Sequence, residues 1–161
     1  MTRFRFLCLL AAGAFVFAGC DSNDDSGNGG AIDRVTINSV EINDFPERKP
    51  NGDAWDGFPS ENPDIFFVLY DADTDQEIDS TEDDEASQAS LDDLPIIWDG
   101  DYRSTDLDRA LVIELYDKEP SSDAEFMGAT DVFTLDEAFD RPTLILRGDE
   151  DIEVLLRLEW D

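Results

Sequence analysis

The stretch from Tyr116 to Gly128 reads Tyr-Asp-Lys-Glu-Pro-Ser-Ser-Asp-Ala-Glu-Phe-Met-Gly and follows directly on the apolar run 110–116. Counted from Asp117, it carries carboxylates at offsets 0, +2 and +8, which are Asp117, Glu119 and Glu125. A strand that ends in such a loop can direct several carboxylate oxygens at one hard cation. Upstream, Asp56 and Asn62 lie in a Gly- and Pro-rich loop that leads into the apolar run 65–70. Two acidic loops, each beside a strand, predict one shared metal site.

The N-terminus has the pattern of an export signal. Arg3 and Arg5 precede an uncharged run, 6–18, that is too short to span a bilayer as a mature helix. The run ends Val-Phe-Ala-Gly-Cys, which resembles the lipobox of bacterial lipoproteins. That resemblance implies a signal peptide over residues 1–19 and a lipid-modified Cys20 as the first residue of the mature chain. The alternative is a buried apolar helix in which Cys20 is incidental.

Residues 20–30 form the next segment, which contains mostly Asp, Ser, Asn and Gly after its Cys and therefore predicts a flexible acidic tether. Cys8 would leave with the signal peptide, so Cys20 has no disulfide partner. We expect the lipid on Cys20 to hold the protein on a bilayer of the cell envelope, at the outer membrane or the cell surface. Asp directly after the Cys leaves retention at the inner membrane open.

Residues 31–161 are long enough for one domain with one core, and they contain no internal repeat. Short apolar segments alternate with Gly, Pro, Asp and Asn clusters, which is typical of an all-β antiparallel sandwich. We expect about eight strands. The segments are 35–42, 65–70, 96–98, 111–116, 126–133, 144–146 and 152–160, with a further strand beginning at Ile78; only 135–139 predicts a helical turn, closed by Pro142.

Three landmarks within residues 35–161 resemble the C2 domain, a family of calcium-dependent membrane-targeting modules. The first is an acid followed six residues later by a ligand residue and Pro, here Asp56 and Asn62-Pro63. The second is a Pro and a Trp that introduce a strand, here with one extra residue between them in 95–98. The third is a strand that ends Tyr-Asp, then acids two and eight residues later, then an aromatic, an aliphatic and Gly, as in 116–128.

The resemblance implies a C2-like β-sandwich whose loops at one end bind Ca²⁺. Asn62, Glu119 and Glu125 stand where the family has Asp, so one charge is lost and two carboxylates are extended by a methylene. Asp64 and Asp123 are near enough in sequence to compensate. The candidate metal ligands are the five positions that the resemblance implies and the two nearby Asp residues. They are Asp56, Asn62, Asp64, Asp117, Glu119, Asp123 and Glu125.

Two aromatic residues flank Asp56 in the first loop, namely Trp55 and Phe58. In the C2 family, apolar residues at this tip enter the lipid interface, which makes both candidates for membrane contact. The alternative is that they pack beneath the loop and hold its shape.

A rival metal site begins at Asp71, where residues 71–82 place acids at positions 1, 3, 5, 9 and 12 of an EF-hand-like loop. Gln76 replaces the Gly of the sharp turn, and the preceding residues predict a strand where an EF-hand has a helix. A β-hairpin explains the segment equally well. The polar run 82–93 predicts a solvated loop.

Acidic residues dominate the whole composition, with 41 Asp and Glu against 11 Lys and Arg and a formal charge of −30. So many carboxylates repel one another unless salt screens their charges, which indicates a salt-rich, halophilic setting. It argues against a nucleic-acid partner. The sequence has no His and, after lipidation, no free thiol, so the common catalytic triads are excluded and we expect no enzyme.

Two hypotheses of function follow from these patterns. The first is a membrane-anchored lipoprotein whose calcium-binding C2-like module recognises a membrane, a glycan or a protein through its loop end. The alternative is a metal-independent structural or interaction lipoprotein of the same fold.

The lipobox-like motif predicts that Cys20→Ala abolishes membrane attachment. The variant should appear in the soluble or unprocessed fraction of a detergent-partition assay, because no other acyl acceptor is present at the cleavage site. An unchanged membrane fraction would refute lipidation at Cys20.

Overall fold

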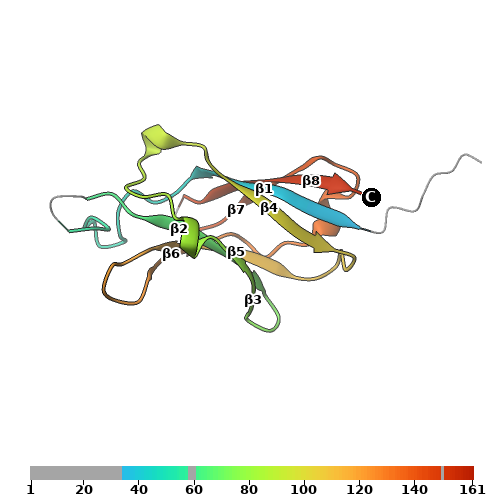
Figure 1. The fold of residues 1–161 in the computed structure, drawn as a ribbon, viewed down its shortest axis with the longest axis horizontal. Helices are drawn as coiled ribbons and strands as arrows, with labels where there is room; N and C mark the ends of the chain where they lie inside the picture. The colour runs from blue at the N-terminus through green and yellow to red at the C-terminus, as the bar shows by residue number, and fades with distance from the viewer. Residues whose placement is uncertain (1–33, 58–60, 150) are drawn as a thin grey trace, which may run out of the picture.

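The computed structural model describes residues 34–57, 61–149 and 151–161. The expected signal peptide 1–19, the lipidated Cys20 with its tether to residue 30, and Phe58 lie outside these ranges. Within these ranges, eight strands and three short 3₁₀ turns follow one another (Figure 1). They are β1 (Val35–Asp44), β2 (Ile65–Asp71), β3 (Gln76–Ser80), η1 (Glu82–Asp84), η2 (Leu91–Asp93), β4 (Ile96–Ser104), β5 (Leu111–Asp117), β6 (Glu125–Ala129), η3 (Leu135–Ala138), β7 (Thr143–Arg147) and β8 (Glu153–Trp160).

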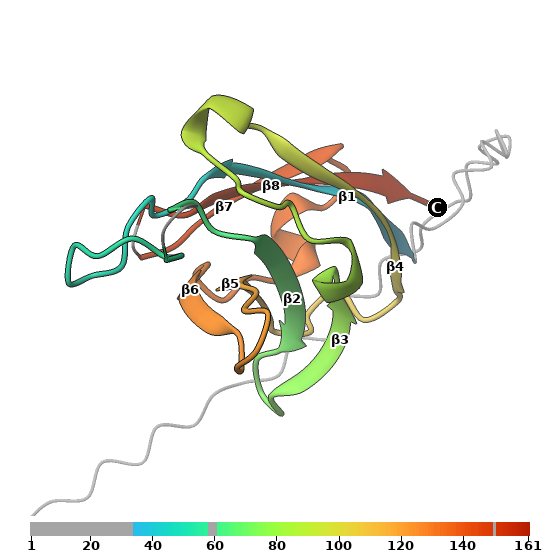
Figure 2. The same cartoon turned by 60° about the vertical axis from the view of Figure 1, so that its left-hand side comes forward.

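The strands form two four-stranded antiparallel sheets that pack face to face. One sheet has the order β4-β1-β8-β7 and the other β3-β2-β5-β6, and Figure 2 shows the two layers edge on. The eight-stranded antiparallel sandwich expected from the sequence is therefore confirmed. The helical turn expected at 135–139 is also present, as η3.

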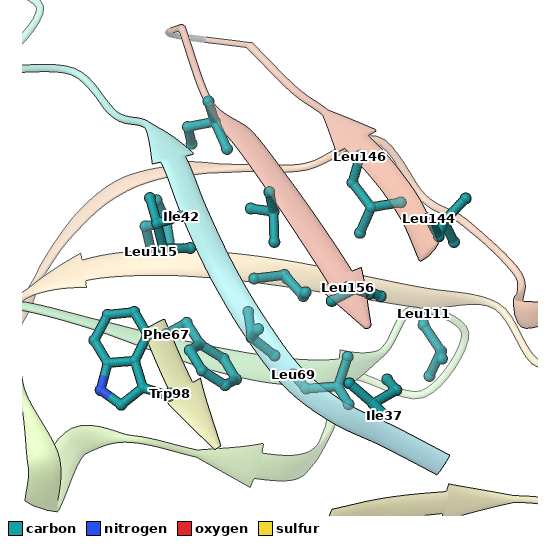
Figure 3. Close-up of a cluster of buried hydrophobic side chains, with 14 of the residues drawn as sticks. Ile37, Ile42, Phe67, Leu69, Trp98, Leu111, Leu115, Leu144, Leu146 and Leu156 are labelled. Carbon is teal, nitrogen blue, oxygen red and sulfur yellow. The ribbon is translucent and has the colours of Figure 1, made fainter. Parts of the chain in front are cut away.

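The core lies between the sheets because side chains alternate along each strand. In β5, Leu111, Ile113 and Leu115 are at most 1% exposed, while the residues between them are partly exposed. They meet β1 and β8 side chains such as Ile37, Ile42 and Leu156 (Figure 3). Each buried aliphatic side chain of this kind contributes roughly 1.5–3 kcal/mol of transfer free energy.

The predicted strand 126–133 is wrong in its C-terminal half. Strand β6 ends at Ala129, after which Thr130 bridges to Gly148 and Phe133 bridges to Leu111. The segment therefore stays beside β5, where the Thr130 N–H donates to the Ile113 carbonyl at 2.9 Å, and it also contacts the hairpin between β7 and β8 in the other sheet. Gly148 permits this close approach, since a Cβ there would lie 1.8 Å from the carbonyl oxygen of Ala129. A tertiary crossing of this kind has no local hydrophobic signal.

The segment 82–93 is only in part the solvated loop that its polarity predicts. Ala86 pairs with Ile65, and Ala89 is 3% exposed with its N–H donating to the Pro63 carbonyl at 2.8 Å. The Trp98 indole donates to the Asp84 carbonyl at 2.7 Å. Small residues between acids thus dock the segment against the end of β2.

Four loops share one end of the sandwich: β1–β2, β3–β4, β5–β6 and β7–β8 (Figure 1). The described chain enters at the other end, where the Asp161 N–H donates to the Arg34 carbonyl at 3.0 Å. Strand β1 runs the length between the two ends, and ten residues span roughly 33 Å. The acidic loops are therefore remote from the point where the N-terminal segment joins the domain.

Within the described residues, none of the helical segments has the length and apolarity needed to cross a bilayer.

The charge balance predicts that salt stabilises the protein. The described residues make six ion pairs, whereas the sequence has 30 more acidic than basic residues. Raising KCl from about 0.05 M to about 2 M shortens the Debye length to a few ångströms and should raise the thermal midpoint. A midpoint that stays flat or falls, measured by calorimetry, would contradict this expectation.

Candidate functional site

Three carboxylates converge at the loop end of the sandwich. Asp117 is the last residue of β5, Glu119 follows two positions later, and Asp56 comes from the β1–β2 loop. One oxygen from each lies within 4.8 Å of the others. The fold thus brings together residues 61 positions apart, as the sequence predicted.

Asp117 is held in place by the register of the second sheet. It continues the inward-facing series Leu111, Ile113, Leu115 and is 0% exposed. Its backbone pairs with Ile65 of β2 on one side and with Glu125 of β6 on the other. The strand period therefore directs a carboxylate toward the rim of the core, where an aliphatic side chain would otherwise continue the line.

The two oxygens of Asp117 differ in their surroundings. Oδ1 accepts a hydrogen bond from the Asp64 N–H at 2.8 Å. Oδ2 is buried and has no hydrogen-bond partner among the described residues. A buried carboxylate oxygen without a donor costs about 1–3 kcal/mol or more, so Oδ2 is a position that a ligand would satisfy.

Burial is the main reason why the pKa of Asp117 is raised from 3.8 to about 6. The Asp64 N–H opposes this shift by stabilising the carboxylate, while the negative charges of Asp56, Glu119 and Asp64 add to it. The cluster therefore concentrates negative charge around a group that burial already disfavours as an anion. A bound cation would relieve both effects.

Gln88 also borders the carboxylate cluster, although it was not predicted from the sequence as part of the site. Its backbone N–H donates to Asp64 Oδ1 at 2.8 Å, and its side-chain amide lies 3.3 Å from both Asp64 Oδ1 and Asp56 Oδ2. Gln88 has a φ of 56°, a left-handed conformation that aims both groups at the cluster. No local pattern in the polar run 82–93 marks this residue.

The other predicted ligands take different positions. Asn62 is exposed and its amide donates to the Gln88 carbonyl at 3.4 Å. Asp64 borders the cluster but its Oδ1 is occupied by Gln88. Asp123 is exposed and lies outside the three-carboxylate group. Glu125 forms an ion pair with Lys49, a residue that no sequence pattern singled out.

The structure does not place Trp55 where a membrane contact needs it. Its side chain belongs to the core, at 4% exposure, and its indole N–H donates to the Pro46 carbonyl at 2.7 Å. Trp55 instead packs beneath the loop, which is the alternative arrangement that the sequence allowed. A buried indole whose N–H is already hydrogen-bonded supports the loop and is not free to enter lipid.

The rival segment 71–82 is a β-hairpin between β2 and β3, so the EF-hand-like interpretation is wrong. Asp71 accepts the N–H groups of Asp73 and Thr74 at 3.1 and 2.9 Å, which shapes the turn. Its other oxygen pairs with Arg109 at 2.6 Å, and this contact lowers the pKa of Asp71. The leading acid of the EF-hand pattern is therefore committed to structure.

The donor set at Asp56, Asp117 and Glu119 fits calcium. Ca²⁺ takes oxygen ligands at about 2.3–2.6 Å, so oxygens on opposite sides of one ion lie up to about 5 Å apart. The three carboxylate oxygens meet that limit. Among the acids of the described residues, Asp117 is set apart by a buried oxygen, Oδ2, that has neither a hydrogen bond nor an ion pair, and this is independent of the clustering.

Neither a scan against protein-family models nor a search of curated proteins found a match. Among solved structures, a C2 domain of a plant extended synaptotagmin is similar to this chain. The two are 20% identical, the match covers 81% of this chain and 95% of that domain, and the TM-score is 0.46. At this identity and TM-score the likeness carries no argument about the fold or the function of this chain.

The raised pKa predicts that Asp117→Asn stabilises the protein at neutral pH in the absence of metal. Because the folded pKa lies above the unfolded one, the contribution of Asp117 to the free energy of unfolding is greatest below about pH 4 and declines as the pH rises to about 6. Asn does not ionise, so the variant does not show this decline. Its free energy of unfolding at pH 7 should exceed that of the wild type by up to about 3 kcal/mol.

Urea unfolding of both proteins in EDTA at several pH values measures this difference. The gap should close between pH 6 and pH 4, and a gap independent of pH would contradict the assignment of the shift to Asp117.

Proposed function

We propose that this protein is a lipid-anchored, calcium-binding recognition module that binds its ligand through the loop end of the sandwich. The observation that carries the proposal is the buried, unpartnered Oδ2 of Asp117 beside Asp56 and Glu119. Carboxylates of this kind cost stability without a cation and gain it with one. The chain has no His, and the proposal is a binding role and not catalysis.

Three carboxylates indicate weak binding. Asn62 contributes no charge and faces Gln88, while Glu125 is already paired with Lys49. We therefore expect a dissociation constant of about 0.1–1 mM, the range of extracellular calcium modules. The remaining coordination positions would be filled by water or by the recognised ligand.

The position of the site within the domain limits which ligands its loops can contact. The loop end lies opposite Arg34, where the N-terminal segment enters. In this proposal the lipid on Cys20 attaches the protein to the cell envelope at one end, and the calcium site is presented at the other. The arrangement favours a ligand other than the anchoring bilayer, such as a second membrane, a glycan or a protein.

A metal-independent interaction lipoprotein is the second candidate. It is favoured by the hydrogen bonds that Gln88 donates to Asp56 and Asp64, since these satisfy part of the cluster without any ion. The two candidates differ in one measurable property, the response of stability to calcium.

Calcium should raise the melting temperature of the wild type at constant ionic strength. At ten times the dissociation constant the gain is about 1.4 kcal/mol. Asp56→Asn and Asp117→Asn should each abolish the calcium-induced rise, because each removes a carboxylate from the cluster. Asp73→Asn is the matched control: it removes the same charge from the hairpin turn and should leave the rise intact.

The decisive calcium concentration is about 10 mM, which is tenfold above the highest dissociation constant expected here. If the wild type melts at the same temperature with and without this calcium, the metal-independent candidate is supported. A calcium response lost in Asp73→Asn and retained in Asp117→Asn would move the site to the β2–β3 hairpin.

A further inference from the structure

Lys49 provides a fixed positive charge at the edge of the acidic cluster. Its ammonium group forms an ion pair with Glu125, the residue whose backbone pairs with Asp117 across β5 and β6. The side chain of Lys49 is 24% exposed. The hydrogen bond to Glu125 raises the pKa of Lys49, burial opposes this shift, and the negative charges of Glu125, Glu119 and Asp117 add to it. The sequence contains only one other lysine, Lys118.

The local backbone holds Lys49 in this position. The Lys49 N–H donates to the Asp53 carbonyl at 3.0 Å, and the Gly52 N–H donates back to the Lys49 carbonyl at 2.8 Å. Gly52 has a φ of 88°, which a residue with a side chain rarely adopts. The ammonium also lies 5.7 Å from the centroid of the Trp55 ring, a cation–π distance. A tight turn and a buried indole thus pre-organise the lysine.

We propose that Lys49 determines the calcium affinity of the acidic cluster by acting as an internal competing cation. The inference rests on the calcium site proposed above. An incoming divalent ion meets a fixed positive charge nearby and finds Glu125 already paired. Binding therefore requires either that the ion accept this repulsion or that the ammonium leave Glu125.

A cleft beside the ion pair can accommodate the Lys49 ammonium group when it leaves Glu125. A cleft of about 430 Å³ adjoins the ion pair and is lined by Lys49, Pro50, Asn51, Trp55, Glu125 and Phe126. The face of Trp55 can retain the cation while the carboxylate of Glu125 turns toward the metal. The pair thus has the properties of a latch, in which one cation replaces another on the same carboxylate.

Removal of the lysine charge should therefore tighten calcium binding by roughly tenfold, the size expected for a single and a double charge several ångströms apart near the surface. Lys49→Met keeps the length and the apolar stem of the side chain, and Lys49→Gln provides a second variant that keeps polarity. Arg103→Met is the charge-matched control, since Arg103 is exposed on β4 opposite Thr36, at the end where the chain enters.

Isothermal titration of CaCl₂ into the wild type and these variants, at equal ionic strength, tests the proposal. We expect tighter binding in both Lys49 variants and a change of less than about twofold in Arg103→Met, which shares only the loss of one charge. Calcium binding by the Lys49 variants alone, with none in the wild type, would also support it. Wild-type binding that is equal to or tighter than that of both Lys49 variants would overturn it and leave the calcium site standing. Absence of binding in all of these proteins would refute the calcium site and this inference together.

A double variant identifies the carboxylate that the lysine occupies. In Lys49→Met/Glu125→Gln the freed ligand is removed again, so the affinity gained in Lys49→Met should be lost for the most part. A gain that persists in the double variant would show that Lys49 acts on the ion only through its charge and would refute the latch at Glu125.

Discussion

The alternation of side chains along β5 is the constraint on which the rest of the site depends. The series that buries Leu111, Ile113 and Leu115 reaches Asp117 with the same inward direction. A carboxylate is thereby fixed at the rim of an aliphatic core, with the rigidity of a central strand behind it. The loops from β1–β2 and β3–β4 then need only to approach this point to add Asp56 and Gln88.

The burial of Asp117 lowers the stability of the metal-free domain at the same place where it provides an oxygen for the proposed cation. Burial raises the pKa of Asp117 and leaves Oδ2 without a donor, so the metal-free domain carries a destabilising group at the centre of the candidate site. Sites of this kind are where local consistency between sequence and fold is expected to fail. Lys49 and Gln88 stabilise the neighbouring carboxylates instead, since Lys49 pairs with Glu125 and Gln88 donates its backbone N–H to Asp64 and its side-chain amide to Asp56 and Asp64.

Features with a local period could be predicted from the sequence, and features set by loop docking could not. The strand 111–117 and its terminal Asp117 have an apolar run and a fixed offset, and the β2–β3 hairpin has its turn residues. The roles of Lys49 and Gln88 depend on how two long loops fold against the sheet end, which leaves no periodic signal. Trp55 had two interpretations because a loop aromatic looks the same in sequence whether it is buried or exposed.

Calcium binding at Asp117 can be tested by a crystal structure of the full chain grown with calcium, with anomalous diffraction data. We expect an anomalous peak about 2.3–2.6 Å from Asp117 Oδ2, shared with Asp56 and Glu119. A peak at another acidic segment, or a water molecule hydrogen-bonded to Asp117 Oδ2 with no metal beside it, would rule out calcium binding at this cluster.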